Sequence, residues 1–172
     1  MFLFLRLFPT TLAIFTQGTS IFEHSTFSSN TASSAGGAVY IAGNATFSST
    51  LFENNRAGVG GGGAVGTGSG ANLLFVGGEN VFTSNVATRV SPAGNQIRIY
   101  GKEESPSTLR FDICKPGTFQ PTSIPTTSDY FIENDFTGCP HACQVPGVGR
   151  FAGIAHATFV KGGECAHGIE HI

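Results

Sequence analysis

The sequence predicts an all-β fold, a parallel β-helix, and three observations support this prediction. A motif that joins Phe-x-x-Asn to Gly-Gly-Ala-Val recurs along the first hundred residues. Repetition with a period of about 20–50 residues is typical of proteins whose units stack along one axis. The residues between these landmarks are mostly Thr, Ser, Val, Ile, Ala and Phe, with few charges. Short runs of such residues, broken by Gly and Asn, favour strands and turns over helices.

The motif occurs twice in near-identical form and a third time in decayed form. Its phenylalanine recurs after 25 and then after 30 residues, and its glycine pair after 26 and then after 32. The three copies are Phe27-Ser28-Ser29-Asn30 with Gly36-Gly37-Ala38-Val39, Phe52-Glu53-Asn54-Asn55 with Gly62-Gly63-Ala64-Val65, and Phe82-Thr83-Ser84-Asn85 with Gly94-Asn95-Gln96-Ile97.

Each unit is interpreted as three short strands separated by turns, which corresponds to one coil of a parallel β-helix. In the second unit, Ala45-Thr46-Phe47-Ser48-Ser49 alternates as a strand with one buried face does. Asn54-Asn55 supplies a bend, because Asn tolerates left-handed backbone. The glycine-rich stretch 58–63 supplies a turn where no Cβ fits. A flexible linker would explain the glycines alone, but Phe and Asn recur in phase with them, which favours ordered turns.

Stacking of successive coils would bring equivalent residues into columns with a spacing of about 4.8 Å. We therefore expect two internal aromatic stacks, an asparagine ladder at one bend, and tight glycine turns. The stack residues are Phe22, Phe27, Phe47, Phe52, Phe75 and Phe82; the ladder is Asn30, Asn55 and Asn85; the turns contain Gly36, Gly37, Gly62, Gly63 and Gly94.

The alternation of Gly-Gly-Ala-Val with Phe-x-x-Asn over about residues 20–100 resembles the repeat of the chlamydial polymorphic outer membrane proteins. This resemblance implies a short right-handed parallel β-helix of about three coils, which we place at residues 20–101. It also implies exposure at a cell surface and a role in adhesion or display rather than catalysis.

From about Gly101 the period is lost and prolines become frequent. We expect an irregular, cysteine-containing segment over residues 102–146. Its sequences Cys114-Lys115-Pro116-Gly117-Thr118-Phe119 and Cys139-Pro140-His141-Ala142-Cys143 resemble part of an ephrin-receptor-like cysteine-rich module. Residues 147–172 match neither pattern and are expected to form a poorly ordered tail.

All four cysteines lie in the last third of the chain. Clustered cysteines in a stretch rich in Gly, Pro and Thr favour disulfides in an oxidising compartment, with three possible pairings. Zinc is the rival interpretation, because His141 lies between two cysteines and His167 follows another, but a matching second pair is lacking. We expect neither metal nor cofactor. The disulfide candidates are Cys114, Cys139, Cys143 and Cys165, and Asn44-Ala45-Thr46 is a glycosylation sequon.

Residues 1–19 allow two interpretations. Residues 1–15 are almost wholly apolar, with Arg6 the only charge, as in the core of a signal peptide. The stretch from Leu12 to Gly18 also echoes the one from Leu73 to Gly78, as a strand of an earlier coil would. A clean apolar run of fewer than about 18 residues disfavours a membrane-spanning helix. Membrane association is therefore expected only through flanking segments.

Composition and the pattern of acidic residues argue against two function classes. Charged residues make up 12% of the chain and its net charge is −2, so no basic surface for nucleic acid is expected. Polysaccharide-cleaving chemistry needs carboxylates presented together. The acids of the repeats, Glu23, Glu53 and Glu79, fall one per coil at unequal offsets. No catalytic residue is therefore predicted.

These observations predict a non-enzymatic protein, adhesive or structural, at a cell surface (outer membrane) or secreted. Its expected partner is a carbohydrate or another surface protein. Three coils rise only about 14 Å, so we also expect the chain to be part of a longer solenoid. The alternative function is a carbohydrate-active β-helix enzyme, of the polysaccharide lyase or hydrolase kind.

Overall fold

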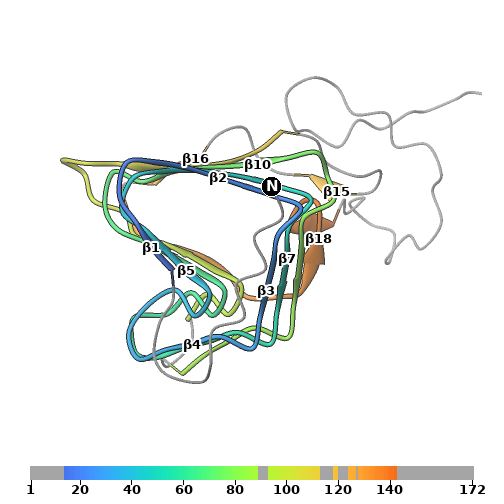
Figure 1. The fold of residues 1–172 in the computed structure, drawn as a ribbon. Helices are drawn as coiled ribbons and strands as arrows, with labels where there is room; N and C mark the ends of the chain where they lie inside the picture. Colours follow the sequence, from blue (N-terminus) through green and yellow to red (C-terminus); the bar gives the residue numbers. More distant parts are fainter. Residues whose placement is uncertain (1–13, 89–92, 113–117, 120–123, 127, 143–172) are drawn as a thin grey trace, which may run out of the picture.

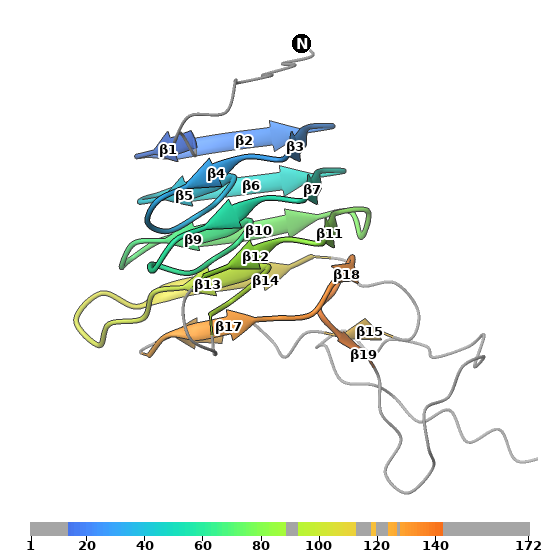
Figure 2. The ribbon, with the colours of Figure 1, turned by 90° about the horizontal axis from the view of Figure 1, so that it is seen from below.

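The computed structural model describes residues 14–88, 93–112, 118–119, 124–126 and 128–142, and the regular elements in these ranges are all strands. The chain winds in successive coils around a main hydrophobic core, and Figure 1 looks along the axis of the coils. In the perpendicular view of Figure 2 the coils lie one on top of another, from β1 at one end to β17 at the other. This arrangement confirms the predicted all-β, parallel β-helical fold.

Each complete coil contains four strands. The first coil comprises β2 (Thr19–Glu23), β3 (Thr26–Ser28), β4 (Thr31–Ala32) and β5 (Val39–Ile41); the second comprises β6 (Asn44–Ser48), β7 (Leu51–Glu53), β8 (Arg56–Ala57) and β9 (Val65–Thr67); the third comprises β10 (Asn72–Val76), β11 (Val81–Thr83), β12 (Val86–Ala87) and β13 (Ile97–Ile99). The prediction of three strands per coil was therefore wrong by one. The extra strand has only two residues, which is too short to give an alternating pattern in the sequence.

Equivalent strands pair in parallel, so four sheets run the length of the coil. The pairs β2–β6 and β6–β10 form one sheet, and β3–β7 and β7–β11 form a second. The pairs β4–β8 and β8–β12 form a third, and β5–β9 and β9–β13 a fourth. Phe22, Phe47 and Phe75 share one register position although Gly77-Gly78 lengthens the third coil. The added residues lie in the turn after β10 and leave the strand register unchanged.

The first described strand, β1 (Ile14–Thr16), pairs in parallel with β5 and so belongs to an incomplete coil ahead of the first. Of the two interpretations of residues 1–19, the strand therefore applies to Ile14–Thr16, and residues 1–13 lie outside the described residues. The predicted correspondence with Leu73–Gly78 was wrong. Ile14 occupies the position of Val39 and Val65 in another sheet, and short apolar runs of this kind occur in more than one strand of a coil.

Stacking continues past residue 101, where we expected the repeats to end. β14 (Ser107–Phe111) pairs in parallel with β10 and begins a fourth layer. Three later strands then close this end in antiparallel orientation: β16 (Ile124–Thr126) on β14, β17 (Tyr130–Ile132) on β13, and β18 (Phe136–Thr137) on β11. β15 (Thr118–Phe119) and β19 (His141–Ala142) form a separate two-stranded sheet. The expected tail, residues 147–172, lies outside the described residues.

The glycine turns are ordered, and the close approach of neighbouring coils accounts for them. Gly36, Gly62 and Gly94 have φ values of 67°, 70° and 64°, which glycine adopts at little cost. A Cβ on Gly63 would lie 2.1 Å from the carbonyl oxygen of Asn95 in the next coil. Gly37 faces Gly63 in the same way, at 2.0 Å. The backbone of the adjacent coil therefore excludes a side chain at Gly37 and Gly63, and the backbone of the same turn excludes one at Gly36, Gly62 and Gly94.

Candidate functional site

Two columns of phenylalanine rings fill the interior of the coil. In one column Phe22, Phe47 and Phe75 stack face to face, with ring centroids 5.0 Å apart at both steps. In the other, Phe27 lies 5.0 Å from Phe52, which lies 4.5 Å from Phe82. All six predicted stack residues therefore lie in these columns.

Each column has a fourth ring that sequence reasoning missed. Phe111 of β14 stacks on Phe75 at 4.8 Å, and Phe136 of β18 stacks on Phe82 at 4.5 Å. Within every layer the two rings also meet edge to face, at 5.4 Å for Phe47 and Phe52. Both geometries are favourable for aromatic pairs. The only signal in the sequence was the Phe content of a stretch that has lost the period.

The predicted asparagines form a ladder of side-chain amides beside the second aromatic column. Asn30 Nδ2 donates to Asn55 Oδ1 at 2.9 Å, and Asn55 Nδ2 donates to Asn85 Oδ1 at 2.8 Å. The side-chain oxygens of Asn55 and Asn85 each also accept a backbone N–H from the coil before, that of Asn30 and that of Asn55. The left-handed backbone of the bend lies one residue earlier, at Ser29, Asn54 and Ser84.

The amide ladder ends in two residues that the sequence prediction overlooked. Asn85 Nδ2 donates to Gln96 Oε1 at 2.7 Å, and Gln96 Nε2 donates to Asp135 Oδ1 at 2.6 Å. Gln96 occupies the position of Ala38 and Ala64 in the earlier coils, where a small residue leads into the strand. The apparent decay of the motif in the third coil is thus a replacement that joins the ladder to the closing strands.

A carboxylate satisfies the backbone donors that the last glycine turn leaves unpaired. In the earlier coils the two N–H groups of the glycine pair donate to carbonyls of the next coil, as Gly62 does to Ala93. In the last turn the N–H groups of Ala93, Gly94 and Asn95 donate to the carboxylate of Glu133, at 2.6, 2.8 and 3.0 Å. Desolvation raises the pKa of Glu133, but these three backbone bonds outweigh it and hold the pKa below its usual value.

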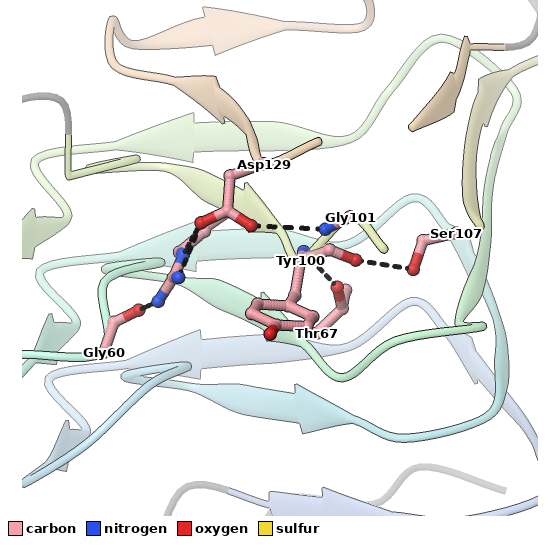
Figure 3. Close-up of polar contacts among 7 residues, drawn as sticks. Gly60, Thr67, Tyr100, Gly101, Ser107 and Asp129 are labelled. Carbon is pink, nitrogen blue, oxygen red and sulfur yellow. Dashed lines mark hydrogen bonds and ion pairs between the residues drawn. The ribbon is translucent and has the colours of Figure 1, made fainter. Parts of the chain in front are cut away.

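Arg98 joins the second coil, the third coil and the closing segment. Its guanidinium donates to the carbonyl oxygen of Gly60 and, at 2.6 and 3.2 Å, to Asp129 Oδ2 (Figure 3). Asp129 Oδ1 accepts the backbone N–H of Gly101 at 3.2 Å. Thr67 Oγ1 accepts the N–H of Tyr100 at 2.9 Å, and the carbonyl of Tyr100 accepts the hydroxyl of Ser107 (Figure 3). These contacts hold the wide turn between β13 and β14 against the stack.

Asp129, Glu133 and Asp135 therefore act together as an acidic cap on the last coil. Each carboxylate accepts backbone or side-chain donors that a further parallel coil would otherwise satisfy. Asp135 also accepts the N–H of Ser84 at 3.1 Å and the hydroxyl of Thr83 at 3.0 Å. These three carboxylates have a structural role, because they accept donors at the edge where the parallel sheets end.

The repeat that builds these ladders matches a known family. Residues 24–42 match the Chlamydia polymorphic membrane protein (Chlamydia_PMP) repeat. The match contains Phe27, Asn30 and the turn Gly36-Gly37, which are the aromatic, amide and glycine positions of the first coil. The expected resemblance to this family is thereby confirmed, whereas no comparison supports the ephrin-receptor-like cysteine module.

No curated protein and no solved structure matches the chain. The polymorphic membrane protein repeat is the repeat of an outer-membrane or surface protein family, which supports a cell-surface location. Within the described ranges no helix is long and apolar enough to span a membrane.

The acids of the repeat coils lie on different elements of the fold. Glu23 and Glu53 end strands of two different sheets, and Glu79 lies in the turn after β10, where it accepts the hydroxyl of Ser49 at 3.2 Å. Among the residues with described positions, no group of three His, Cys, Asp or Glu side chains could hold a metal ion.

The remaining candidates lie at the edges of the described structure. Cys139 is buried and packs into the aromatic core, and Cys114, Cys143 and Cys165 lie outside the described residues. Asn44 begins β6 and is exposed, and its Oδ1 accepts Nδ2 of Asn72 at 2.8 Å. The sequon therefore lies on an accessible outer face of the coil.

The acidic cap predicts a specific sensitivity to pH. Because the pKa of Glu133 is lower when folded, ionised Glu133 stabilises the fold above about pH 4.5, its reference pKa. This stabilisation is lost as pH falls from that value through the lowered folded pKa. We expect the free energy of unfolding, from urea denaturation at pH 7 and pH 3, to fall less in Glu133→Gln than in the wild type. Glu103→Gln, at an exposed position, is the control and should keep the wild-type pH dependence.

Proposed function

We propose that this protein is a non-enzymatic, surface-displayed repeat protein with an adhesive or structural role. The coil serves as a rigid support, and its outer faces present the binding surface. The observation that carries the proposal is that the Phe and Asn residues of the repeat motif make contacts inside the coil. These residues form aromatic stacks and amide hydrogen bonds within the coil, so their role is structural. The family that shares the motif is a surface protein family.

We place the binding face on the outer side of the sheet formed by β2, β6, β10 and β14. Its outward positions carry a polar row in which Asn72 Nδ2 donates to Asn44 and Thr108 Oγ1 donates to Asn72 Oδ1 at 2.6 Å. Asn44 and Asn72 are exposed. Rows of amides and hydroxyls at the spacing of strands, about 4.8 Å, suit the repeated hydroxyl groups of a polysaccharide.

Adhesion is tested with beads coated with the protein and presented to immobilised polysaccharides. We expect retention of wild-type beads, loss of most retention in an Asn44→Ala/Asn72→Ala double variant, and no loss in Val59→Ala. Val59 is exposed on a glycine turn away from this face. Equal retention by both variants would contradict the assignment of the face.

The same incubation separates adhesion from the alternative of a carbohydrate-active enzyme. Retention without release of soluble oligosaccharide supports the proposal, and time-dependent release would overturn it.

Protease treatment of intact cells tests the location, because a surface protein is cleaved while cytoplasmic markers survive. The intact mass of the native product tests membership in a longer protein, which a stable product of the encoded length would contradict.

We also propose that Cys139 forms a disulfide that fixes the closing segment. Cys139 is 2% exposed and lies three residues after Phe136, the last ring of its column. A covalent link there would hold β18 on the stack in an oxidising compartment. Peptide mapping without reduction should find Cys139 linked to another of the four cysteines, and recovery of alkylated Cys139 would contradict the link.

A further inference from the structure

The two ends of the coil are built differently. At one end the last layer is covered by antiparallel strands and by the carboxylates of Glu133 and Asp135. At the other end β1, β2, β3 and β4 are each the terminal strand of their sheet (Figure 2). Within the described part of the chain, nothing pairs with their outer edges. In the described residues, one end of the solenoid is therefore covered, and the other presents strand edges without a paired strand.

The open layer contains Phe22, the least buried ring of the two aromatic columns. Phe27 is 8% exposed and Phe22 is only partly buried, whereas Phe47 and Phe52 in the layer below are fully buried. Among the described residues, Phe22 and Phe27 each have a ring stacked on one face, from Phe47 and Phe52 respectively. An occupant of this end would therefore gain both backbone hydrogen bonds and ring contacts.

The residues ahead of β1 do not suit a further coil in register. Ile14 is paired with Val39, so an in-register coil would place Leu12 at the position of Gly37 and Leu5 at that of Asn30. A Cβ at Gly37 would lie 2.0 Å from the backbone of the next coil, and a Cβ on Leu12 would meet the same obstacle. Leucine also cannot continue the amide ladder. Leu12 and Leu5 therefore do not fit the glycine and asparagine positions of the coil pattern.

The molecule itself shows that a coil end accepts antiparallel strands. β18 lies antiparallel on β11, yet Phe136 stacks on Phe82 as closely as the parallel neighbour Phe52 does, at 4.5 Å. β17 adds Ile132 opposite Ile97 in the same way. Reversed strands can therefore supply the next layer of this core.

We infer that the open end binds a second copy of this chain, through antiparallel pairing of β2 with β2 of the partner. β2 is the longest strand of the open layer. A register centred on Ile21 sets the two Ile21 side chains opposite each other on the outer face, where Ile21 is 65% exposed. It also sets the small side chain of Ser20 opposite Phe22, which leaves room for the ring.

Charge and symmetry favour this occupant. Glu23 is the only Asp, Glu, Lys or Arg in residues 14–43, and the register places it opposite Thr19 rather than another Glu23. The contact is self-complementary and closed, because the far end of each copy is sealed. The assembly therefore stops at two copies and does not form a filament. This inference does not depend on the adhesive role.

Sedimentation equilibrium of the full chain tests the inference. We expect a mass twice that of the chain at concentrations on the order of 10 µM, and a monomer for Ile21→Lys, which places two like charges opposite each other. Val59→Lys adds the same charge at a position that is 76% exposed and remote from β2, and it should stay dimeric. Far-UV circular dichroism should show the same strand content in all three proteins. A monomeric wild type, or a dimeric Ile21→Lys, overturns the inference.

Oxidative cross-linking tests the register independently. Directly opposed residues of antiparallel strands have Cα atoms about 4.5–5.5 Å apart, which suits a disulfide. Ile21→Cys should form a covalent dimer under mild oxidation, whereas Val59→Cys and the wild type should form none. Equal cross-linking of the two cysteine variants would overturn the β2 pairing.

Discussion

Replacement of Phe52 by alanine is expected to lower the free energy of unfolding by about 4 kcal/mol, within the range for large core aromatics. Phe52 is fully buried and contacts three rings: Phe27 and Phe82 in its column, and Phe47 in its own layer. Its removal leaves a cavity between stacked layers. The backbone hydrogen bonds between coils prevent these layers from collapsing to fill that space. Urea denaturation followed by circular dichroism measures the change.

The matched control is Phe15→Ala. Phe15 also stacks on one aromatic ring, that of Tyr40 at 5.7 Å, but it is 58% exposed on the outer face. We expect a loss below about 1.5 kcal/mol, the upper range for a single aromatic pair. Similar losses for the two variants would mean that the internal column does not dominate stability.

The fold could be predicted because the motif places equivalent Phe and Asn residues above one another in successive coils. Phe and Asn recur with the same neighbours, and a fixed period brings equivalent residues together in a stacked architecture. Strand number per coil could not be predicted in the same way. The two residues of β4 have no periodicity, and they are strand because β8 lies beside them. Tertiary pairing, rather than local preference, defines such short strands.

The cap could not be predicted, because its residues act across long sequence separations. Glu133 lies 38 to 40 residues from the three N–H groups it accepts, and no local pattern marks it. Gln96 seemed to be decay of the motif, since it stands where earlier coils have alanine. Its meaning depends on Asp135, which the chain brings close only by reversing direction. The last coil has no following coil to pair with, so its end is specified by residues that depart from the repeat motif.

Asn55→Ala is expected to cost about 3–5 kcal/mol, because it leaves several buried groups without partners. Asn55 Nδ2 donates to the carbonyl of Phe27 at 2.9 Å and to Asn85 Oδ1. Asn55 Oδ1 accepts both the backbone N–H and the side-chain Nδ2 of Asn30. Asn55 is 1% exposed, so water cannot replace these bonds without opening the bend. Urea denaturation gives the loss.

Asn44→Ala isolates the contribution of burial. Asn44 also takes part in an amide–amide bond of 2.8 Å between adjacent coils, with Asn72, but on the exposed face. Water can satisfy the groups that this variant releases, so we expect a loss below about 1 kcal/mol. Equal losses of unfolding free energy in Asn44→Ala and Asn55→Ala would mean that the buried amide ladder contributes no more than surface hydrogen bonds do.

The double variant Asn55→Ala/Asn85→Ala shows whether the ladder acts as one unit. Asn85 accepts Asn55 Nδ2 and donates to Gln96, so loss of either amide removes part of what the other contributes. The sum of the two single losses in unfolding free energy should therefore exceed the loss in the double variant, by about 0.5–3 kcal/mol. Strict additivity would mean that each bend is held independently. In that case the continuous chain of amides from Asn30 to Asp135 would have no energetic consequence beyond its separate bonds.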